Sequence, residues 1–312
     1  MTIKKKEELA KNKFSIDKDE KKTQTENNQP KPAWIRVNWF DSEKSVQTKK
    51  ILKQMKLSTV CQAASCPNRA ECFHSGTATF MILGNVCTRR CAFCDVEYGT
   101  PAAISTSEPQ RIATAVKALN LKYVVITSVT RDDLPDGGAL HFARCIKAIR
   151  EALPEVLIEI LTPDFQHCLD QALNIFEGQL PDVFNHNIET IPRLYPEVRP
   201  TANFNHSLTL LKQFKLRFPH IPIKSGLMVG LGETKDELIE TLKMLRLHLV
   251  ERLTIGQYLQ PTRYHLPVKC YITPEEFTSY ATIAKSIGFT QVMSGPLVRS
   301  SYHAKDQHLK QQ

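Results

Sequence analysis

Two hydrophobic patterns alternate along the chain from about residue 78. Short, mostly apolar runs predict strands, and longer amphipathic stretches between them predict helices. Five helices are expected, at about 108–119, 139–152, 165–177, 204–217 and 234–249. Six strands are expected at Thr79–Leu83, Tyr123–Thr127, Val156–Leu161, Asp182–His186, Ile223–Val229 and Leu253–Tyr258.

The helix expected near residue 234 has a clear start. Thr234 and Glu237 match a capping box, in which each side chain bonds the other residue's backbone. An apolar face follows at steps of four, three and four, formed by Leu238, Leu242, Leu245 and Leu249. Upstream of the alternating region, residues 46–57 predict another short helix.

The alternation of strand and helix predicts the α/β fold class. Strands joined by single helices form right-handed βαβ units, and these build a parallel sheet. A partial six-stranded (β/α)6 barrel and an open sheet fit the pattern equally well. In either case the functional groups are expected at the carboxyl ends of the strands.

Composition and charge narrow the class of protein. The chain has 312 residues, 42% of them apolar, but no uncharged apolar run of membrane-spanning length. Residues 1–20 are charged throughout and lack the apolar region of a secretory signal, so we expect a cytoplasmic protein without a membrane contact.

The net charge of +9 is concentrated near the start of the chain. Residues 1–56 hold 15 Lys and Arg against 8 Asp and Glu. A disordered basic arm over residues 1–30 is the simpler interpretation, and a docking surface for an acidic protein is the alternative. Nucleic acid is not expected as a partner, because acids and few aromatic residues separate the basic ones.

Six of the nine cysteines fall between residues 61 and 94, in two triplets. A disulfide framework is not expected without a secretory signal, so the grouping indicates metal or cluster ligation. The second triplet, Cys87, Cys91 and Cys94, has the spacing C-x3-C-x2-C. Three neighbouring thiolates can hold a 4Fe–4S cluster and leave its fourth iron open, whereas a structural zinc site needs a distant fourth ligand.

The first triplet, Cys61, Cys66 and Cys72, has the spacing C-x4-C-x5-C. Near the other end of the chain stands Arg299-Ser300-Ser301-Tyr302. The C-x3-C-x2-C motif, with Phe93 before its last cysteine, resembles that of the radical S-adenosylmethionine (SAM) superfamily.

The first triplet and the Arg-Ser-Ser-Tyr element resemble the lipoyl synthase family of sulfurtransferases. Other segments resemble that family in order between residues 31 and 304, namely Lys31–Ile35, Arg131–Gly138, His186–Thr190, Gly230–Thr234 and Gln257–Pro261.

This resemblance implies a fold, two cofactors and a reaction. The fold is a partial barrel of radical SAM type with extensions at both ends. One 4Fe–4S cluster on Cys87, Cys91 and Cys94 binds SAM and generates a 5′-deoxyadenosyl radical. That radical removes hydrogen from C6 and C8 of an octanoyl chain on a carrier lysine. An auxiliary 4Fe–4S cluster donates the two sulfur atoms that give lipoyl-lysine; its implied ligands are Cys61, Cys66, Cys72 and Ser301, with Ser300 as the alternative serine.

The resemblance also implies partners and contacts with SAM. The carrier is a lipoyl domain or a glycine-cleavage carrier protein, and a small protein such as ferredoxin or flavodoxin supplies electrons. Arg131–Gly138 is expected near the amino group of SAM. Glu189 and its neighbour Asn187 are expected near the ribose. Lys224 faces the SAM carboxylate or, alternatively, lies at the surface.

Four regions follow from these assignments: the arm 1–30, an extension 31–77 with the auxiliary cysteines, the barrel 78–288 and an extension 289–312. Two other functions stay open. A different radical SAM enzyme would keep both triplets, and a zinc-binding interaction module would hold zinc instead of iron.

Overall fold

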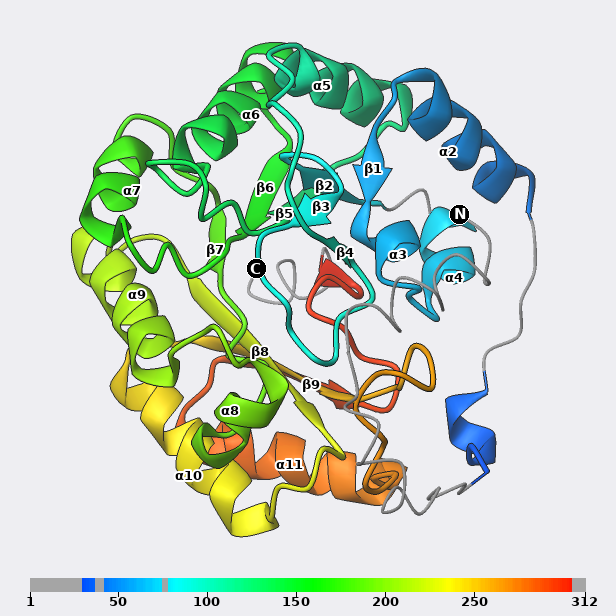
Figure 1. Cartoon of the computed structure of the whole chain (residues 1–312), viewed down its shortest axis with the longest axis vertical. Coiled ribbons are helices and arrows are strands. Elements are labelled where there is room, and N and C mark those ends of the chain that lie inside the picture. Colours follow the sequence, from blue (N-terminus) through cyan, green and yellow to red (C-terminus); the bar gives the residue numbers. More distant parts are fainter. Residues whose placement is uncertain (1–29, 37–41, 75–77, 305–312) are drawn as a thin grey trace.

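The computed structural model describes residues 30–36, 42–74 and 78–304, and its centre is a curved, mainly parallel sheet (Figure 1). Its strand order is β1-β2-β5-β6-β7-β8-β9-β10, and only the β1–β2 pair is antiparallel. The bounds are β1 Ser58–Thr59, β2 Thr79–Ile82, β5 Tyr123–Ser128, β6 Leu157–Leu161, β7 Val183–Asn185, β8 Ile223–Val229, β9 Arg252–Gln257 and β10 Gln291–Gly295.

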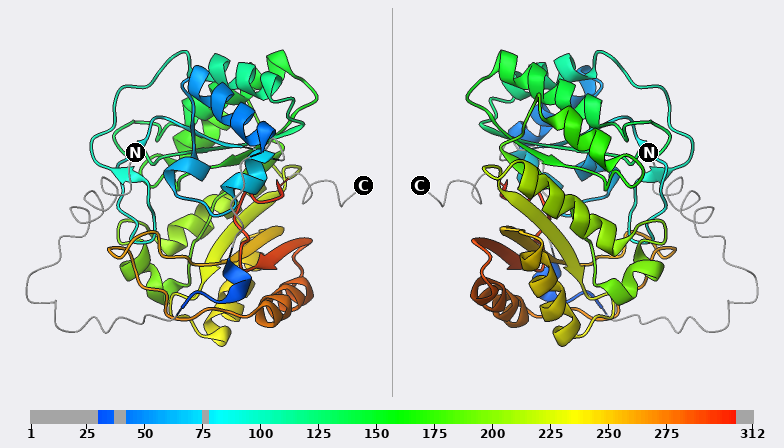
Figure 2. Two further views of the ribbon diagram at one scale, coloured as in Figure 1. Left: turned by 90° about the vertical axis from the view of Figure 1, so that its right-hand side faces the viewer. Right: turned by 90° about the vertical axis from the view of Figure 1, so that its left-hand side faces the viewer.

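Helices cover the outside of this sheet, and the carboxyl-end loops cross its inside (Figures 1 and 2). The longer helices are α2 Glu43–Gln54, α5 Glu108–Ala118, α6 Ala139–Ala152, α7 Leu169–Phe176, α9 Phe204–Arg217, α10 Lys235–Leu247 and α11 Pro274–Ile287. The shorter elements are η2 Ala33–Ile35, α3 Val60–Ala63, α4 Arg69–His74, η3 Pro192–Leu194, α8 Tyr195–Val198 and a two-stranded sheet of β3 Val86–Cys87 and β4 Glu97–Tyr98.

The α/β class, the six predicted strands and the helices between them are confirmed. The count of six strands is too low, because the sheet gains β1 at one edge and β10 at the other. Among the described residues β1 and β10 do not pair with each other, so the curved sheet is open.

The extra parallel strand β10 lies inside the segment 289–312 that was predicted as an extension, so the sheet continues into that segment. The other region boundaries stay predictions. The arm 1–29 lies outside the described residues.

The core between sheet and helices is apolar and aromatic. Phe184 of β7 stacks on Phe214 of α9 with 3.7 Å between ring centroids, and Phe176 of α7 meets both rings edge-on. Such packing fixes each helix against its strand and so fixes the loops at the strand ends.

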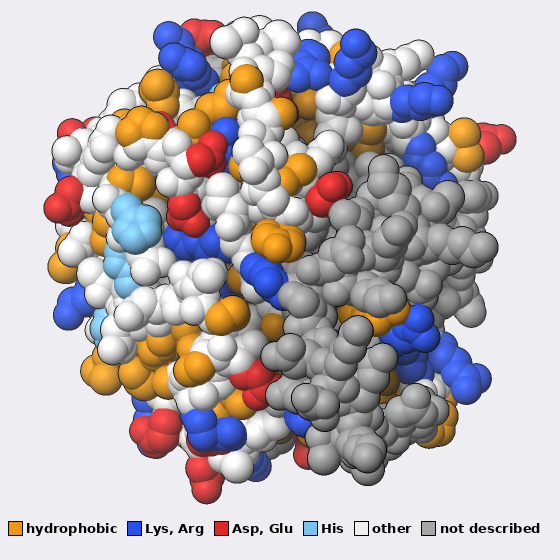
Figure 3. Space-filling model, in the orientation of Figure 1, with side chains coloured by type: hydrophobic (Ala, Val, Ile, Leu, Met, Phe, Trp, Pro, Cys, Tyr) orange, Lys and Arg blue, Asp and Glu red, His pale blue; other side chains and the backbone are white. Residues whose placement is uncertain are grey.

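One side of the described molecule is rich in lysine. Four of the twelve residues of α2 are Lys, and Figure 3 shows blue side chains along the rim over α2 and α5. None of the helices in the described part of the chain has the length and hydropathy of a membrane span.

Candidate functional site

The triplet Cys87, Cys91 and Cys94 lies on the loop after the first parallel strand. Cys87 ends β3, and the other two cysteines lie in the turns that follow. The backbone amides of Arg89 and Thr130 both donate to Cys87 Sγ, at 3.4 and 3.3 Å. Because Thr130 follows β5, the loops of two neighbouring strands meet at Cys87, at the carboxyl edge where the sequence placed it.

Arg89, inside the cysteine motif, anchors this loop to two others. Its buried guanidinium bonds both carboxylate oxygens of Asp132 at 2.7 and 2.8 Å, and Nη1 bonds Asp164 at 2.6 Å. Burial would raise the pKa of Asp164, but hydrogen bonds from Arg89 lower it below its ordinary value. Forked arginine–carboxylate pairs are rigid, so they fix the loop that carries the cysteines. Arg89 was not predicted as a site residue, and the one signal for it in the sequence is a cation inside the motif.

Cys91 lies beside a second buried arginine, Arg199, which the sequence analysis also missed. Arg199 Nη1 donates to the carbonyl of Asn187 at 3.2 Å and to Tyr195 Oη at 3.0 Å. Burial raises the pKa of the Cys91 thiol, the Arg199 charge lowers it, and the charges of Cys87 and Glu189 raise it. A cation and a carboxylate therefore flank this cysteine.

Asn187 and Glu189, predicted to contact SAM, both lie at this place. Glu189 has a left-handed backbone (φ 68°) where the chain bridges to Leu227 of β8. Such conformations are uncommon outside glycine and cluster at functional sites. Burial raises the pKa of Glu189, while Arg199 and a hydrogen bond from the Asn187 side chain lower it. The three side chains form one polar group beside Cys91.

Loops from later in the chain hold the end of the cysteine motif, at residues 92–94, in place. The ring Nε2 of buried His265 donates to the carbonyl of Cys94 at 3.1 Å, and the amide of Ala92 donates to the carbonyl of Val198 at 3.0 Å. Phe93 packs against a small buried cluster of Ile191, Leu194, Val198, Leu231 and Tyr258. Phe93 thus joins the motif to three later loops.

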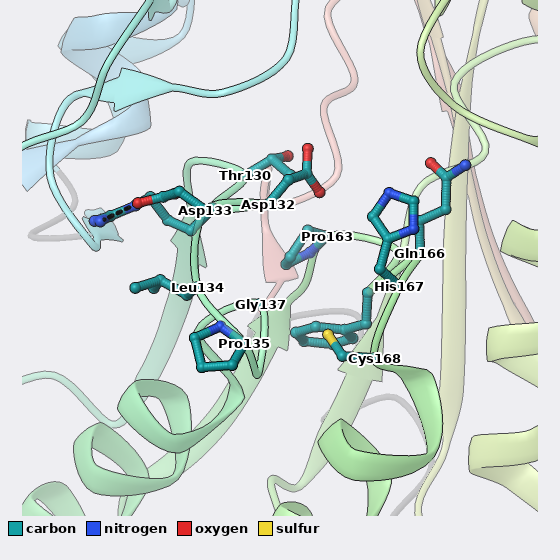
Figure 4. Close-up of a pocket in the computed structure, with 12 residues that line it drawn as sticks. Thr130, Asp132, Asp133, Leu134, Pro135, Gly137, Pro163, Gln166, His167 and Cys168 are labelled. Atoms are coloured by element: carbon teal, nitrogen blue, oxygen red, sulfur yellow. Dashed lines mark hydrogen bonds and ion pairs between the residues drawn. The ribbon is translucent and has the colours of Figure 1, made fainter.

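A cavity of about 430 Å³ is lined by Thr130, whose amide bonds Cys87, and by two loops at the strand ends (Figure 4). The loop after β5, with Thr130 and Asp132, forms one wall, and the loop after β6, with Gln166, His167 and Cys168, forms the other. Gly137 belongs to the first wall, and a side chain there would collide with Phe165. The predicted Arg131–Gly138 segment thus lines a cavity next to the motif.

The triplet Cys61, Cys66 and Cys72 is brought together by two short helices. Cys61 lies in α3, Cys72 in α4, and Cys66 in the turn between them. Burial and the charge of Cys66 raise the pKa of the Cys61 thiol to about 11, and burial with the charges of Cys61 and Cys66 raises the pKa of Cys72. The three thiols therefore lie near one another, with Cys61 buried and the other two half-buried.

The two serines near the end of the chain point to different places. Ser301 Oγ accepts from Thr79 Oγ1 at 2.8 Å, and the Thr79 side chain also contacts Cys61. Ser300 Oγ accepts from Asn185 at 2.7 Å and donates to Asn187 at 3.1 Å. Thr79 thus links Ser301 to the first triplet, whereas Ser300 faces the inside of the sheet.

Lys224 is buried, so its alternative placement at the surface is wrong. Its Nζ lies 3.0 Å from Glu159 Oε1 and donates to the carbonyl of Ser300 at 2.6 Å. These contacts direct the amine to the segment that carries the serines, and its predicted contact with SAM stays a prediction.

Arg299 connects the two cysteine groups electrostatically. Arg299 is half-buried, and the loss of water around its guanidinium lowers its pKa, while the charges of Cys66 and Glu189 raise it. Cys66 belongs to the first triplet and Glu189 to the polar group at the second. The two groups are therefore neighbours across one arginine.

The chemistry of the donor groups suits iron–sulfur clusters. Each triplet offers three thiols, and thiolates are the usual ligands of a 4Fe–4S cluster, each binding a different iron. Within the described parts of the chain, no three His, Cys, Asp or Glu side chains converge closely enough to hold one metal ion.

Comparison with known proteins agrees with this arrangement. Residues 81–245 match the family model of the radical SAM superfamily. A lipoyl synthase of Alcanivorax borkumensis is 56% identical over 280 residues, which cover 90% of this chain and 86% of that protein. A lipoyl synthase of Syntrophotalea carbinolica is 58% identical over 88% of this chain and 89% of its own length.

Among solved structures, Streptococcus suis SuiB bound to S-adenosylmethionine aligns with a TM-score of 0.55 at 14% identity, covering 74% of this chain and 54% of that one. This likeness supports the fold. The identities over nearly the whole chain, together with the match over residues 81–245, settle the family: this chain belongs to the lipoyl synthase family of the radical SAM superfamily.

Proposed function

We propose that this chain inserts sulfur at C6 and C8 of an octanoyl-lysine carried by another protein, and so makes the lipoyl group. The observation that carries the proposal is the pair of neighbouring cysteine triplets, in a chain 56–58% identical to lipoyl synthases over most of its length. One cubic cluster per triplet gives the two cofactors that this reaction needs.

The ligands follow from the two groups. Cys87, Cys91 and Cys94 would hold the cluster that binds SAM, and Cys61, Cys66, Cys72 and Ser301 would hold the auxiliary one. The link from Cys61 through Thr79 supports Ser301 over Ser300. When bound, the first cluster supplies the electron for cleavage of SAM, and the auxiliary cluster supplies the sulfur.

The surrounding side chains would orient SAM and exclude water. The Glu189 carboxylate, held by Asn187 and Arg199, can accept hydrogen bonds from both ribose hydroxyls. The Arg131–Gly138 loop, which lines the cavity next to the motif, would approach the amino group of SAM. Phe93, packed on apolar side chains, closes the motif against solvent. A dry site protects reactive carbon radicals from side reactions.

The acceptor would be a lipoyl domain or a glycine-cleavage carrier protein, and a small protein such as ferredoxin or flavodoxin would supply electrons. We place the reaction in the cytoplasm, because thiols stay reduced there.

The test is an anaerobic assay with octanoylated carrier. Wild-type protein should bind about eight irons per chain, the content of two 4Fe–4S clusters, and should give lipoylated carrier. A Cys61/Cys66/Cys72 triple alanine variant should lose about half the iron, still cleave SAM, and insert no sulfur.

The converse variant is the matched control. A Cys87/Cys91/Cys94 triple alanine protein should also lose about half the iron, but SAM cleavage should stop as well. Zinc in place of iron would support the interaction module instead. SAM cleavage with no sulfur on any octanoylated carrier would support a different radical SAM enzyme.

A further inference from the structure

We propose that the buried Glu159–Lys224 pair, together with Asn185, is a positioning device that holds Ser300 and thereby places the Ser301 hydroxyl at the auxiliary cysteines. This inference rests on the proposed function, since it takes Ser301 as the fourth ligand of the auxiliary cluster. It assigns a task to three residues on the sheet, far from Ser301 in sequence.

The pair lies inside the sheet and binds the serine segment directly. Glu159 on β6 and Lys224 on β8 are each only 1% exposed, and their charged atoms are 3.0 Å apart. Lys224 Nζ donates to the carbonyl of Ser300 at 2.6 Å. An ammonium group has three donors, so Lys224 can bond Glu159 and the Ser300 carbonyl at the same time, and the bond to Glu159 restrains its position.

Asn185, on the strand β7 between these two, adds a second hold. Its Nδ2 donates to Glu159 Oε1 at 2.8 Å and to Ser300 Oγ at 2.7 Å. Tyr123 Oη donates to the other carboxylate oxygen of Glu159 at 2.6 Å. Both the backbone and the side chain of Ser300 are therefore fixed by one hydrogen-bonded group.

Fixing Ser300 sets the direction of the next side chain. The Ser300 hydroxyl bonds Asn185 and Asn187, while the adjacent Ser301 hydroxyl meets Thr79, which also contacts Cys61. The segment is also tied to the auxiliary region by Asn68 and Glu71, which bond the carbonyl of Leu297 and Tyr302 Oη. Ser300 is thus held from β7 and β8, whereas the contact of Ser301 comes from Thr79 of β2.

Fold stability alone does not require such a pair. Buried ion pairs contribute little net stability compared with apolar residues of similar volume, because both charges lose their water. The Lys224 ammonium group, however, makes a directional hydrogen bond to the Ser300 carbonyl. Apolar side chains could not position the serine segment in this way.

The experiment measures how tightly the auxiliary cluster is held. A Glu159→Gln, Lys224→Met double variant removes both charges together, so neither member of the pair remains as a lone buried charge. In anaerobic protein loaded with both clusters, a chelator should remove the auxiliary iron at least about fivefold faster than in wild type. Iron at Cys87, Cys91 and Cys94 should leave at the wild-type rate.

A double-mutant cycle with Ser301→Ala tests the route of the effect. If the pair acts through Ser301, the two charge changes should add nothing to iron loss once Ser301 is alanine. Equal effects in both backgrounds would overturn the proposal, as would unchanged iron release in the double variant. Ser300→Ala keeps the ion pair and should speed the release of auxiliary iron by a smaller factor. This variant provides the test if the double variant does not fold.

Arg150→Met, Asp182→Asn is the control, since it removes another ion pair beside β6 whose described contacts do not include the serine segment. It should leave iron release unchanged. Faster iron release in this control would mean that any loosening of β6 releases iron. That result would contradict a specific role of the Glu159–Lys224 pair. If wild-type protein holds only one cluster, the proposed function itself fails; two clusters in wild type with no effect of the variants refute this inference alone.

Discussion

At the scale of single residues, buried hydrogen bonds fix protonation states. His186, which follows β7, lies 2.9 Å from both the carbonyl of Thr162 and the hydroxyl of Ser207. A carbonyl only accepts, so Nδ1 carries the proton and Nε2 accepts from Ser207. Burial first, and then the Arg199 charge, lower the pKa of His186 from 6.5 to about 4. The imidazole of His186 is therefore uncharged at neutral pH, and its hydrogen bonds fix the backbone next to Asn187.

His186 should therefore make folding depend on pH. Because its pKa is lower in the folded chain, the unfolded chain binds more protons between pH 6.5 and 4, and stability falls as the pH drops through that window. The full loss amounts to about 3 kcal/mol, since one pKa unit corresponds to about 1.4 kcal/mol.

Urea unfolding at pH 7.5 and 5.5, for wild type and His186→Gln, measures this effect. The pH-dependent loss should shrink in the variant, although the variant is less stable at pH 7.5. An identical pH dependence in both proteins would refute the assignment.

At the scale of elements, helix ends determine where the loops begin. The capping box of Thr234 and Glu237 is present as predicted, but α10 ends at Leu247, so Leu249 lies beyond the helix with a left-handed φ of 66°. The helix α11, which was not predicted, begins with a second capping box of Thr273 and Glu276. It leads into β10, the last strand before the serine segment.

Thr273→Ala should loosen the first turn of α11. Loss of a capping side chain costs about 1 kcal/mol, so amides there should exchange with deuterium about fivefold faster. Thr282→Ala is the control, because Thr282 is exposed in the middle of the same helix. Equal exchange in the two variants would show that the box does not hold this helix end.

At the scale of the whole molecule, the end of the chain returns across the sheet to the auxiliary region. Gly256 of β9 permits this return, since a side chain there would lie 2.1 Å from the carbonyl of Val298. Backbone atoms cannot yield as a flexible side chain can.

Gly256→Ala should therefore displace residues 297–302 and, with them, Ser301. We expect faster protease cleavage in this segment and selective loss of auxiliary iron. Gly178→Ala, at a position with open space around it, should change neither quantity. Wild-type cleavage and iron content in Gly256→Ala would show that the close approach is not needed.

Local patterns in the sequence determined most of the architecture and both cysteine groups. Strand and helix periods are set by neighbouring residues, so six strands and the helices between them were predictable. The triplets were predictable because their ligands lie within a few residues of one another. The edge strands β1 and β10 were missed because a two-residue strand and a polar strand carry little hydrophobic signal.

Only the tertiary structure decided what depends on contacts between distant residues. The bond from Thr79 to Ser301 joins residues 222 positions apart in sequence, and the bond from Lys224 to Ser300 joins residues 76 apart. Arg89 gains its partners Asp132 and Asp164 only when loops from several strands meet. Sequence spacing reports neighbours along the chain, whereas burial and charge pairing depend on which strands the folded sheet places side by side.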